Sequence, residues 1–159
     1  MRSPLAPVAR ALGTRPWLMR IAPWVPAVDH WLHRVTRGRL ALLDLAGLPS
    51  LRLETTGRRS GLRRASNLLY CPDGEDYVLV ASNWGKPNDP GWAHNLRACP
   101  EATVLLRGRA VPVLAREVTG EEYDAWWPRL VRFWPGYAME RRLAGRRLPI
   151  FVLTGRYPE

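Results

Sequence analysis

Short β-like runs, rather than long helices or strand–helix pairs, dominate the chain from residue 48 onward. Pro72-Asp73-Gly74 separates two of these runs, and Gly108 separates two others. Proline presets φ and glycine accepts φ > 0, so both positions predict turns. The runs are LRLETT (51–56), ASNLLYC (65–71), DYVLVAS (76–82), ATVLLRG (102–108), RAVPVLAREV (109–118) and LPIFVLT (148–154).

This order constrains the fold class. No βαβ alternation is present, so a parallel Rossmann sheet is disfavoured. Neighbouring runs joined by short turns predict about six antiparallel strands with three or four helices inserted. A small closed or split β-barrel fits this order, because closure removes exposed sheet edges. We therefore expect a mainly β protein with helices.

Helical signals interrupt the strands. Asp29 is a candidate N-cap for a helix over residues 29–46, whose apolar positions, Trp31 among them, are spaced for a buried face. Asp89 precedes Pro90, which predicts a second helix with aspartate as its cap. Thr119 opens a capping box before the longest apolar stripe, which runs to Trp134.

Residues 1–28 differ from the rest of the chain. They hold five prolines, so long regular structure is not expected there. We treat them as an N-terminal segment ahead of a domain over residues 29–159. Trp17, Trp24 and Trp31 recur every seven residues. Two interpretations stay open: the segment packs on the domain, or it rests on a membrane surface or covers a site.

The net charge of the chain limits the kinds of partner that it is expected to bind. The chain has 159 residues, a formal net charge of +10 and a single lysine, Lys86, among 24 basic residues. Guanidinium forks match phosphate and carboxylate geometry. The charge implies an anionic partner, whether nucleic acid, membrane surface or small polyanion. Two cysteines form neither a disulfide framework nor a metal motif, and no apolar run is long enough to cross a membrane.

Residues 54–64, ETTGRRSGLRR, carry the strongest anion-binding signal. Glycines let a backbone approach a ligand, while hydroxyls and guanidiniums donate hydrogen bonds to phosphate. A solvated basic loop is the alternative, and composition alone leaves the two balanced. No Walker A pattern is present. The residues that supply this chemistry are Thr55, Thr56, Gly57, Arg58, Arg59, Ser60, Gly61 and Arg64.

Two further segments carry candidate site residues. Residues 81–96 pass from a strand end to a helix N-terminus, where Trp84 and Trp92 could wall a flat ring and Asn95 shares the Trp92 face. A core helix with packed tryptophans is the alternative. In WPGY, which spans residues 134–137, Tyr137 follows a helix break and could face a pocket. His30 and His33 lack further ligands, so no metal site is expected.

Together these segments resemble one family. TTGRRSGLRR, VASNWGKPNDPGWAHNLRACPEATV and the WPGY and LPIFVL pieces are similar, over about residues 32–154, to the deazaflavin (coenzyme F-420)-dependent nitroreductases. That group is related to the FMN-binding flavin reductases and pyridoxamine-phosphate oxidases. The resemblance implies a six-stranded split β-barrel. It also implies hydride transfer from reduced F-420 to a quinone-like or nitroaromatic acceptor.

The resemblance also implies site residues. The arginine loop would hold the phosphate and acidic tail of the coenzyme, while Ser82 and Tyr137 would stabilise charge arriving on the acceptor as the catalytic residues. The acceptor pocket would be formed by Trp134, Tyr137 and Glu140. The expected coenzyme-binding residues are Thr56, Gly57, Arg58, Arg59, Ser60, Gly61, Arg64, Asn67, Ala81, Ser82, Asn83, Lys86, Trp92 and Asn95.

The chain departs from the family pattern at four positions. Asn67 stands where proline is frequent in the family. Asn83 stands where a basic residue is frequent, and Lys86 could take over the role of that residue. Ala93 replaces an aromatic residue, and Glu140 replaces the second pocket tyrosine. We expect a wider or more polar acceptor pocket.

Two other functions stay open at this point. One is an FMN- or other flavin-dependent reductase, and the other is a non-catalytic basic protein that binds F-420, a membrane or nucleic acid. Nucleic acid is the less expected partner, because no DNA- or RNA-binding motif is present. We expect a cytoplasmic monomer or homodimer, either free or peripheral on the inner membrane face.

Overall fold

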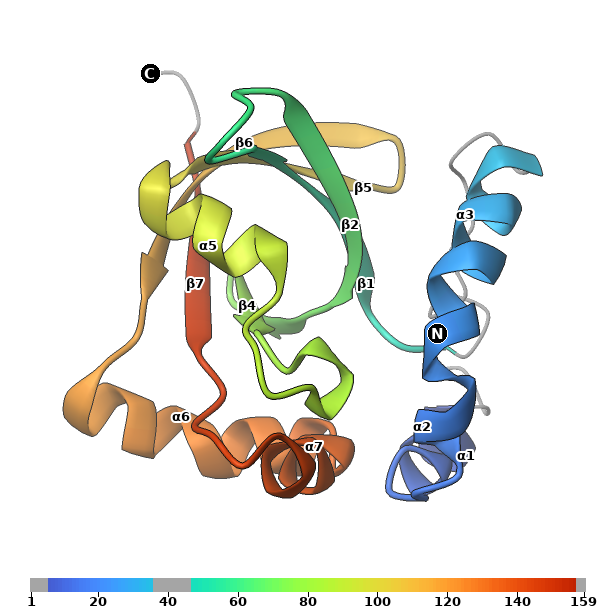
Figure 1. The fold of residues 1–159 in the computed structure, drawn as a ribbon. Coiled ribbons are helices and arrows are strands. Elements are labelled where there is room, and N and C mark those ends of the chain that lie inside the picture. The colour runs from blue at the N-terminus through green and yellow to red at the C-terminus, as the bar shows by residue number, and fades with distance from the viewer. Residues whose placement is uncertain (1–5, 36–46, 157–159) are drawn as a thin grey trace.

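A curled antiparallel sheet of seven strands forms the centre of the computed structural model, which describes residues 6–35 and 47–156 (Figure 1). The strand order is β2-β1-β5-β6-β7-β4-β3, and every neighbouring pair is antiparallel. The mixed α+β class predicted from the sequence is confirmed. The strands are β1 (Ser50–Thr56), β2 (Arg63–Leu69), β3 (Cys71–Asp73), β4 (Asp76–Val80), β5 (Glu101–Leu106), β6 (Arg109–Glu117) and β7 (Ile150–Gly155).

The predicted count of six strands is wrong by one, and the reason lies at Tyr70. The run 65–71 was expected to be one strand, but it is divided between β2 and β3. These two strands occupy opposite edges of the sheet, although only Tyr70 separates them in the chain. The Tyr70 N–H donates to the Pro49 carbonyl at 3.1 Å, and its ring meets Tyr77 edge-on at 5.5 Å. The sheet must therefore curl until its edges meet.

Both faces of the strands β4 and β7 are buried, which explains their continuous apolar sequences. Leu79 packs into a core inside the curled sheet, whereas Val78 and Val80 belong to a second core outside it. Side chains alternate across a strand, so both cores draw on the same two strands. The inner core also contains Trp92 and Leu96 of the helix α5 (Gly91–Ala98).

The outer core lies between the sheet and two helices, α6 (Gly120–Phe133) and α7 (Gly136–Ala144), which run beneath it in Figure 1. Thr119 is the N-cap of α6, as predicted, but its side chain makes no capping hydrogen bond. Tyr123 of α6 is buried, and its hydroxyl donates to the Leu148 carbonyl at 2.8 Å. This bond ties α6 to the chain entering β7.

The predicted cap of α5 is wrong. Pro90, not Asp89, occupies the N-cap position, and the helix begins at Gly91. The Asp89 carboxylate instead forms ion pairs with Arg97 and Arg146. An ionic partner 57 residues away in the chain has displaced the local capping interaction.

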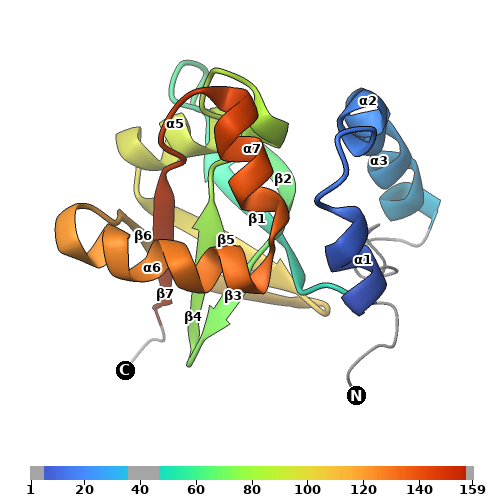
Figure 2. The ribbon, with the colours of Figure 1, turned by 90° about the horizontal axis from the view of Figure 1, so that it is seen from below.

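The N-terminal helices stand beside the sheet, as the view from below shows (Figure 2). They are short, as the prolines predicted: α1 (Ala6–Leu12), α2 (Leu18–Ile21), the 3-10 turn η1 (Ala22–Trp24) and α3 (Val25–Val35).

The predicted helix over residues 29–46 in fact begins at residue 25, so Asp29 is an interior residue and not an N-cap. Residues 36–46 lie outside the described part. Trp31 is 62% exposed, so its expected burial is also wrong. The boundary expected after residue 28 falls within α3. In the described ranges, no helix has both the length and the apolar character to cross a membrane.

Candidate active site

A cavity of about 870 Å³ opens between the curled sheet, α5, α7 and the N-terminal helices. One end is bounded by the loop between β1 and β2, and the other by the end of α6 and the start of α7. Thr55 and Trp84, named as candidates from the sequence alone, line this cavity. So do thirteen of the seventeen site residues that the family resemblance implied. They are Gly57, Arg58, Arg59, Ser60, Arg64, Asn67, Ser82, Asn83, Trp92, Asn95, Trp134, Tyr137 and Glu140.

The loop between β1 and β2 closes on itself through its glycines. The Gly57 N–H donates to the Leu62 carbonyl at 2.7 Å, and the Gly61 N–H donates to the Gly57 carbonyl at 2.8 Å. A Cβ at Gly57 would lie 2.7 Å from Ser60 Oγ, and Gly61 has φ of +69°. Only glycine fits both positions without strain. The turn thus places Arg58 and Arg59 at the rim of the cavity.

Asn95 fixes this loop from below. Its side chain is 5% exposed, and its Oδ1 accepts from the Arg58 backbone N–H at 3.1 Å and from the Arg58 guanidinium at 3.4 Å. Its Nδ2 donates to Thr55 Oγ1 at 3.1 Å. Asn95 therefore acts first as the anchor between α5 and the arginine loop, a role that the sequence did not predict.

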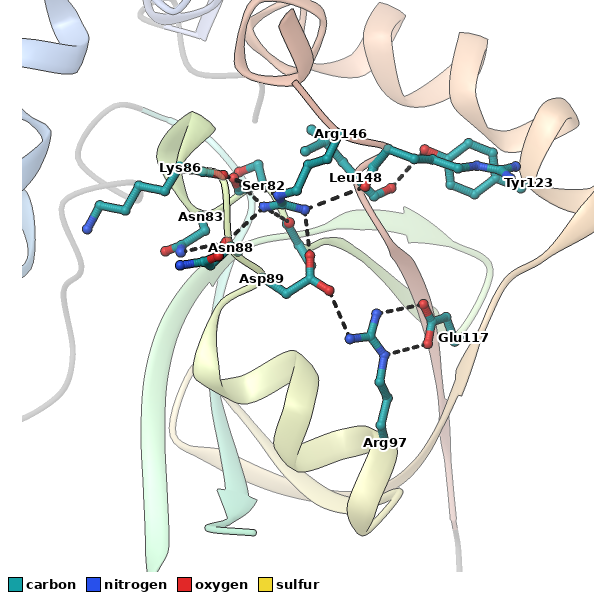
Figure 3. A network of polar contacts seen from close by, with 12 residues as sticks. Ser82, Asn83, Lys86, Asn88, Asp89, Arg97, Glu117, Tyr123, Arg146 and Leu148 are labelled. Atoms are coloured by element: carbon teal, nitrogen blue, oxygen red, sulfur yellow. Dashed lines mark hydrogen bonds and ion pairs between the residues drawn. The ribbon is translucent and has the colours of Figure 1, made fainter. Parts of the chain in front are cut away.

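A network of arginines and carboxylates holds the opposite wall (Figure 3). Arg146 donates to the carbonyls of Ala81, Ser82 and Asn88 at 3.2, 3.3 and 3.0 Å and also pairs with Asp89. Arg97 continues the network, with 2.8 Å contacts to Asp89 and to both oxygens of Glu117.

These bonds fix the backbone over residues 81–89. Within that stretch lies the turn η2 (Asn83–Gly85), where Asn83 and Trp84 have φ of 49° and 58°. Left-handed conformations of such residues are strained, and strain of this kind concentrates at functional sites.

Tyr137 and Glu140, on the first turns of α7, are the buried polar groups of this end of the cavity. Their exposed fractions are 4% and 5%. Ser82 Oγ donates to Glu140 Oε1 at 3.2 Å, while Glu140 Oε2 has no hydrogen-bond partner in the described part of the chain. Burial raises the pKa of Glu140 from 4.5 to about 7, against a smaller lowering by the Ser82 bond. Burial also raises the pKa of Tyr137 well above 10, so the phenol stays neutral.

Four predicted residues lie outside this cavity. Thr56 and Gly61 border a smaller hollow on the far side of the arginine loop. Ala81 is fully buried in the inner core, so its side chain packs there rather than against the cavity. Lys86 is exposed, and its carbonyl accepts from Arg146 at 3.2 Å. Contacts of these four with a coenzyme stay predictions from the family pattern.

Packing of the N-terminal segment on the domain, or over a site, was left open by the sequence, which did not indicate which of its residues line the cavity. Gly13, Val25, Pro26 and Asp29 line the cavity, and Asp29 accepts a hydrogen bond from the Asn67 side chain of β2. An ideal Cβ at Gly13 would overlap the Trp134 ring, so the segment approaches α6 very closely there. The prolines and tryptophans of this segment showed a change of composition but not where it would dock.

The arrangement defines a class of protein. One cavity is lined both by the guanidinium donors of the arginine loop and by the buried side chains of Tyr137 and Glu140, which suits an elongated anionic molecule with a flat ring. Within the described ranges, no group of three or more His, Cys, Asp or Glu side chains is placed to bind a metal ion. The lining of the cavity, with its guanidiniums and buried polar side chains, has the character of an organic-coenzyme site.

Comparison with known proteins identifies the family. The sequence model described as "F420H(2)-dependent quinone reductase" matches residues 28–155, and the chain belongs to that family. The reductase Rv1261c of Mycobacterium tuberculosis, described in the same words, is 33% identical over 133 residues. The match covers 79% of this chain and 86% of that protein.

Two solved structures share the fold and sequence features. One, described as an F420-H2 dependent reductase (FDR-A), is 34% identical with a TM-score of 0.60, covering 66% of this chain and 93% of that one. Another, described as a domain-swapped dimer, is 30% identical with a TM-score of 0.62, covering 80% and 97%. The family relationship indicated by the sequence motifs is confirmed.

Proposed function

We propose that this protein is an oxidoreductase that transfers a hydride from reduced coenzyme F-420 to a quinone-like acceptor. The observation that carries the proposal is the single cavity joining the arginine loop to Ser82, Tyr137 and Glu140, in a chain that belongs to the quinone reductase family. Nitroaromatic compounds, expected from the sequence resemblance, are flat and electron-poor like quinones. We propose that they can also accept the hydride.

The residues present fit the coenzyme. Arg58, Arg59 and Arg64 surround one end of the cavity, and Ser60 adds a hydroxyl, so the donor set matches a phosphodiester and carboxylates. When bound, the reduced coenzyme supplies the hydride. The chain's own residues orient the ring, exclude water and hold protons. We assign ring contact to Ser82 and Trp92, which both line the cavity. We also propose that the curled seven-stranded sheet is a split β-barrel.

Tyr137 has a defined task in this proposal. Its phenol lines the cavity, is almost completely buried and keeps its proton at neutral pH. A neutral phenol in a water-poor pocket donates a strong hydrogen bond to an oxygen that gains charge. We therefore assign Tyr137 to the acceptor oxygen, beside Trp134, which closes the pocket toward the N-terminal segment through its contact with Gly13.

A fluorescence titration with F-420 tests the proposal. Arg59→Ala and Arg64→Ala each remove a charged donor worth about 1.5–3 kcal/mol, so the Kd should rise about 10- to 100-fold while the fold stays intact. Arg63→Ala is the matched control, because Arg63 pairs with Glu54 at 3.1 Å, is 76% exposed and does not line the cavity. Equal affinity in all three variants would show that the loop does not hold the coenzyme. FMN competing as strongly as F-420 would favour a flavin-dependent enzyme.

We further propose that the N-terminal segment contacts a membrane surface. Trp17, Trp24 and Trp31 are 50%, 72% and 62% exposed, and the exposed Arg15 and Arg20 lie in the same segment. Tryptophan and arginine together favour the interface of anionic lipids. Flotation with anionic vesicles should recover the protein, and replacing the three tryptophans with alanine should abolish recovery. Equal recovery with neutral vesicles would argue against the electrostatic part.

A further inference from the structure

One buried oxygen in the cavity wall has no hydrogen-bond partner among residues 6–35 and 47–156. Glu140 Oε2 is one of only two such side-chain atoms in the described residues, the other being Arg10 Nε. Glu140 is 5% exposed and lines the main cavity. An unpaired buried carboxyl oxygen is unfavourable, so one in the wall of a binding site indicates a group that pairs with a ligand.

Among the described residues, no cationic side chain is paired with Glu140. Arg146, which reaches the same turn, directs its donors to Asp89 and to backbone carbonyls, including that of Ser82. Arg141, on the same helix, lies over the Trp127 ring. Among the described residues, the groups that face Glu140 are the hydroxyl of Ser82, which follows β4, and the neutral phenol of Tyr137 on α7. Cys71 of β3 contributes to the raised pKa of Tyr137. Burial without a counter-charge favours the protonated acid.

We infer that Glu140 is the general acid of the reaction, donating the proton on Oε2 to an oxygen of the quinone-like acceptor. This inference rests on the proposed function. The hydride carries two electrons to the quinone, which becomes a hydroquinone monoanion, and the Glu140 O–H bond breaks as the new acceptor O–H bond forms. The product is the neutral hydroquinone. The Glu140 carboxylate, held by the Ser82 hydroxyl, then takes up one proton from solvent, which restores the acid.

Geometry and acidity separate Glu140 from its neighbours. The Ser82 proton is directed to Glu140 Oε1, so it is not aimed at the acceptor. The Tyr137 phenol is a much weaker acid than Glu140, whose pKa of about 7 lies near neutral pH. Proton donors are most effective when their pKa is close to the working pH. Tyr137 then binds the oxygen and Glu140 protonates it.

The test compares Glu140→Gln with wild type and with Glu75→Gln, an exposed glutamate in the turn between β3 and β4. Three measurements are made: fluorescence titration with F-420, single-turnover oxidation of reduced F-420 by menadione from about pH 5 to about pH 9, and the infrared band of the protonated carboxyl without coenzyme. We expect Glu140→Gln to bind F-420 within about twofold of wild type and to react about 10²–10⁴ times more slowly.

The pH dependence distinguishes a proton donor from a structural carboxyl. As pH rises through about 7, the wild-type rate should fall and the infrared band of the protonated carboxyl should disappear. Glu140→Gln should show neither change. Glu140→Asp keeps a transferable proton, so its rate should still fall as pH rises. This variant replaces Glu140→Gln in the test if the glutamine variant does not fold. A glutamine variant with wild-type rate and profile would overturn the inference. Failure of wild type to bind F-420 would instead refute the proposed function, while the infrared titration would still report on Glu140.

Discussion

Replacing Glu140 with glutamine should stabilise the protein at high pH, although the same change should slow the reaction. The wild-type carboxyl has a pKa of about 7 in the folded protein and 4.5 as its ordinary value. Between these values the folded state keeps a proton that the unfolded chain has lost. Stability is therefore complete below about pH 4.5 and decreases as pH rises through about 7. Glutamine does not titrate and escapes this loss.

The magnitude follows from the difference between the two pKa values. A separation of about 2.5 corresponds to about 3 kcal/mol at full ionisation, since each pKa unit is worth about 1.4 kcal/mol. Part of this loss has already occurred at about pH 5. The free energy of unfolding of Glu140→Gln relative to wild type should therefore rise by about 2.5 kcal/mol between about pH 5 and about pH 8.

Urea denaturation followed by tryptophan fluorescence at the two pH values measures this difference. Glu75→Gln, with its exposed side chain, is the control and should track wild type at both. If the relative stability of Glu140→Gln changes by less than about 0.5 kcal/mol between the two pH values, the carboxyl is not held protonated by burial, and the reasoning fails.

Three further changes probe the walls of the cavity. Asn95→Ala leaves the Arg58 backbone N–H without its acceptor and the buried Thr55 hydroxyl without its donor, and should lower the free energy of unfolding by about 2–3 kcal/mol in urea denaturation while weakening F-420 binding. Asp89→Asn removes the shared carboxylate charge of Arg97 and Arg146, and should lower stability by about 1–3 kcal/mol, with the loss reduced in high salt. Gly85→Ala, with φ of 76° and a Cβ placed 3.2 Å from Leu143, should lower the thermal midpoint by several degrees, about 1–2 kcal/mol.

Local patterns predicted the elements well where the strands were short and the turns carried glycine or proline. β4, β5, β6 and α6 begin and end within a few residues of the positions expected from sequence. The break at Tyr70 was not predictable, because apolar and small polar residues run through it without a turn signal. The break arises because β2 pairs with β1 whereas β3 pairs with β4. The sequence of one run does not show that its two halves have different partner strands.

The candidate site was predictable in membership but not in roles. Many residues of the cavity wall belong to the motifs recognised in the sequence, and the family resemblance predicted that these motifs form one site. They could not show that the Asn95 amide is used by the arginine loop, nor that Asp89 pairs with Arg146 instead of capping α5. Both depend on side chains far apart in the chain. The Glu140 departure was recognised in sequence, but its burial and its unpaired oxygen required the structure.

The position of β7 in the sheet also has a consequence for biosynthesis. β7 is inserted between β6 and β4, so the hairpin of β3 and β4 has no other strand joining it to β6. A ribosome must therefore synthesise residues 150–155 before this hairpin can be joined to β6, and until then the apolar strand β4 has β3 but not β7 beside it. Non-local strand pairing of this kind is slow and leaves nascent chains prone to association. We expect premature stops before Ile150 to yield aggregates or degraded chains rather than a smaller folded enzyme.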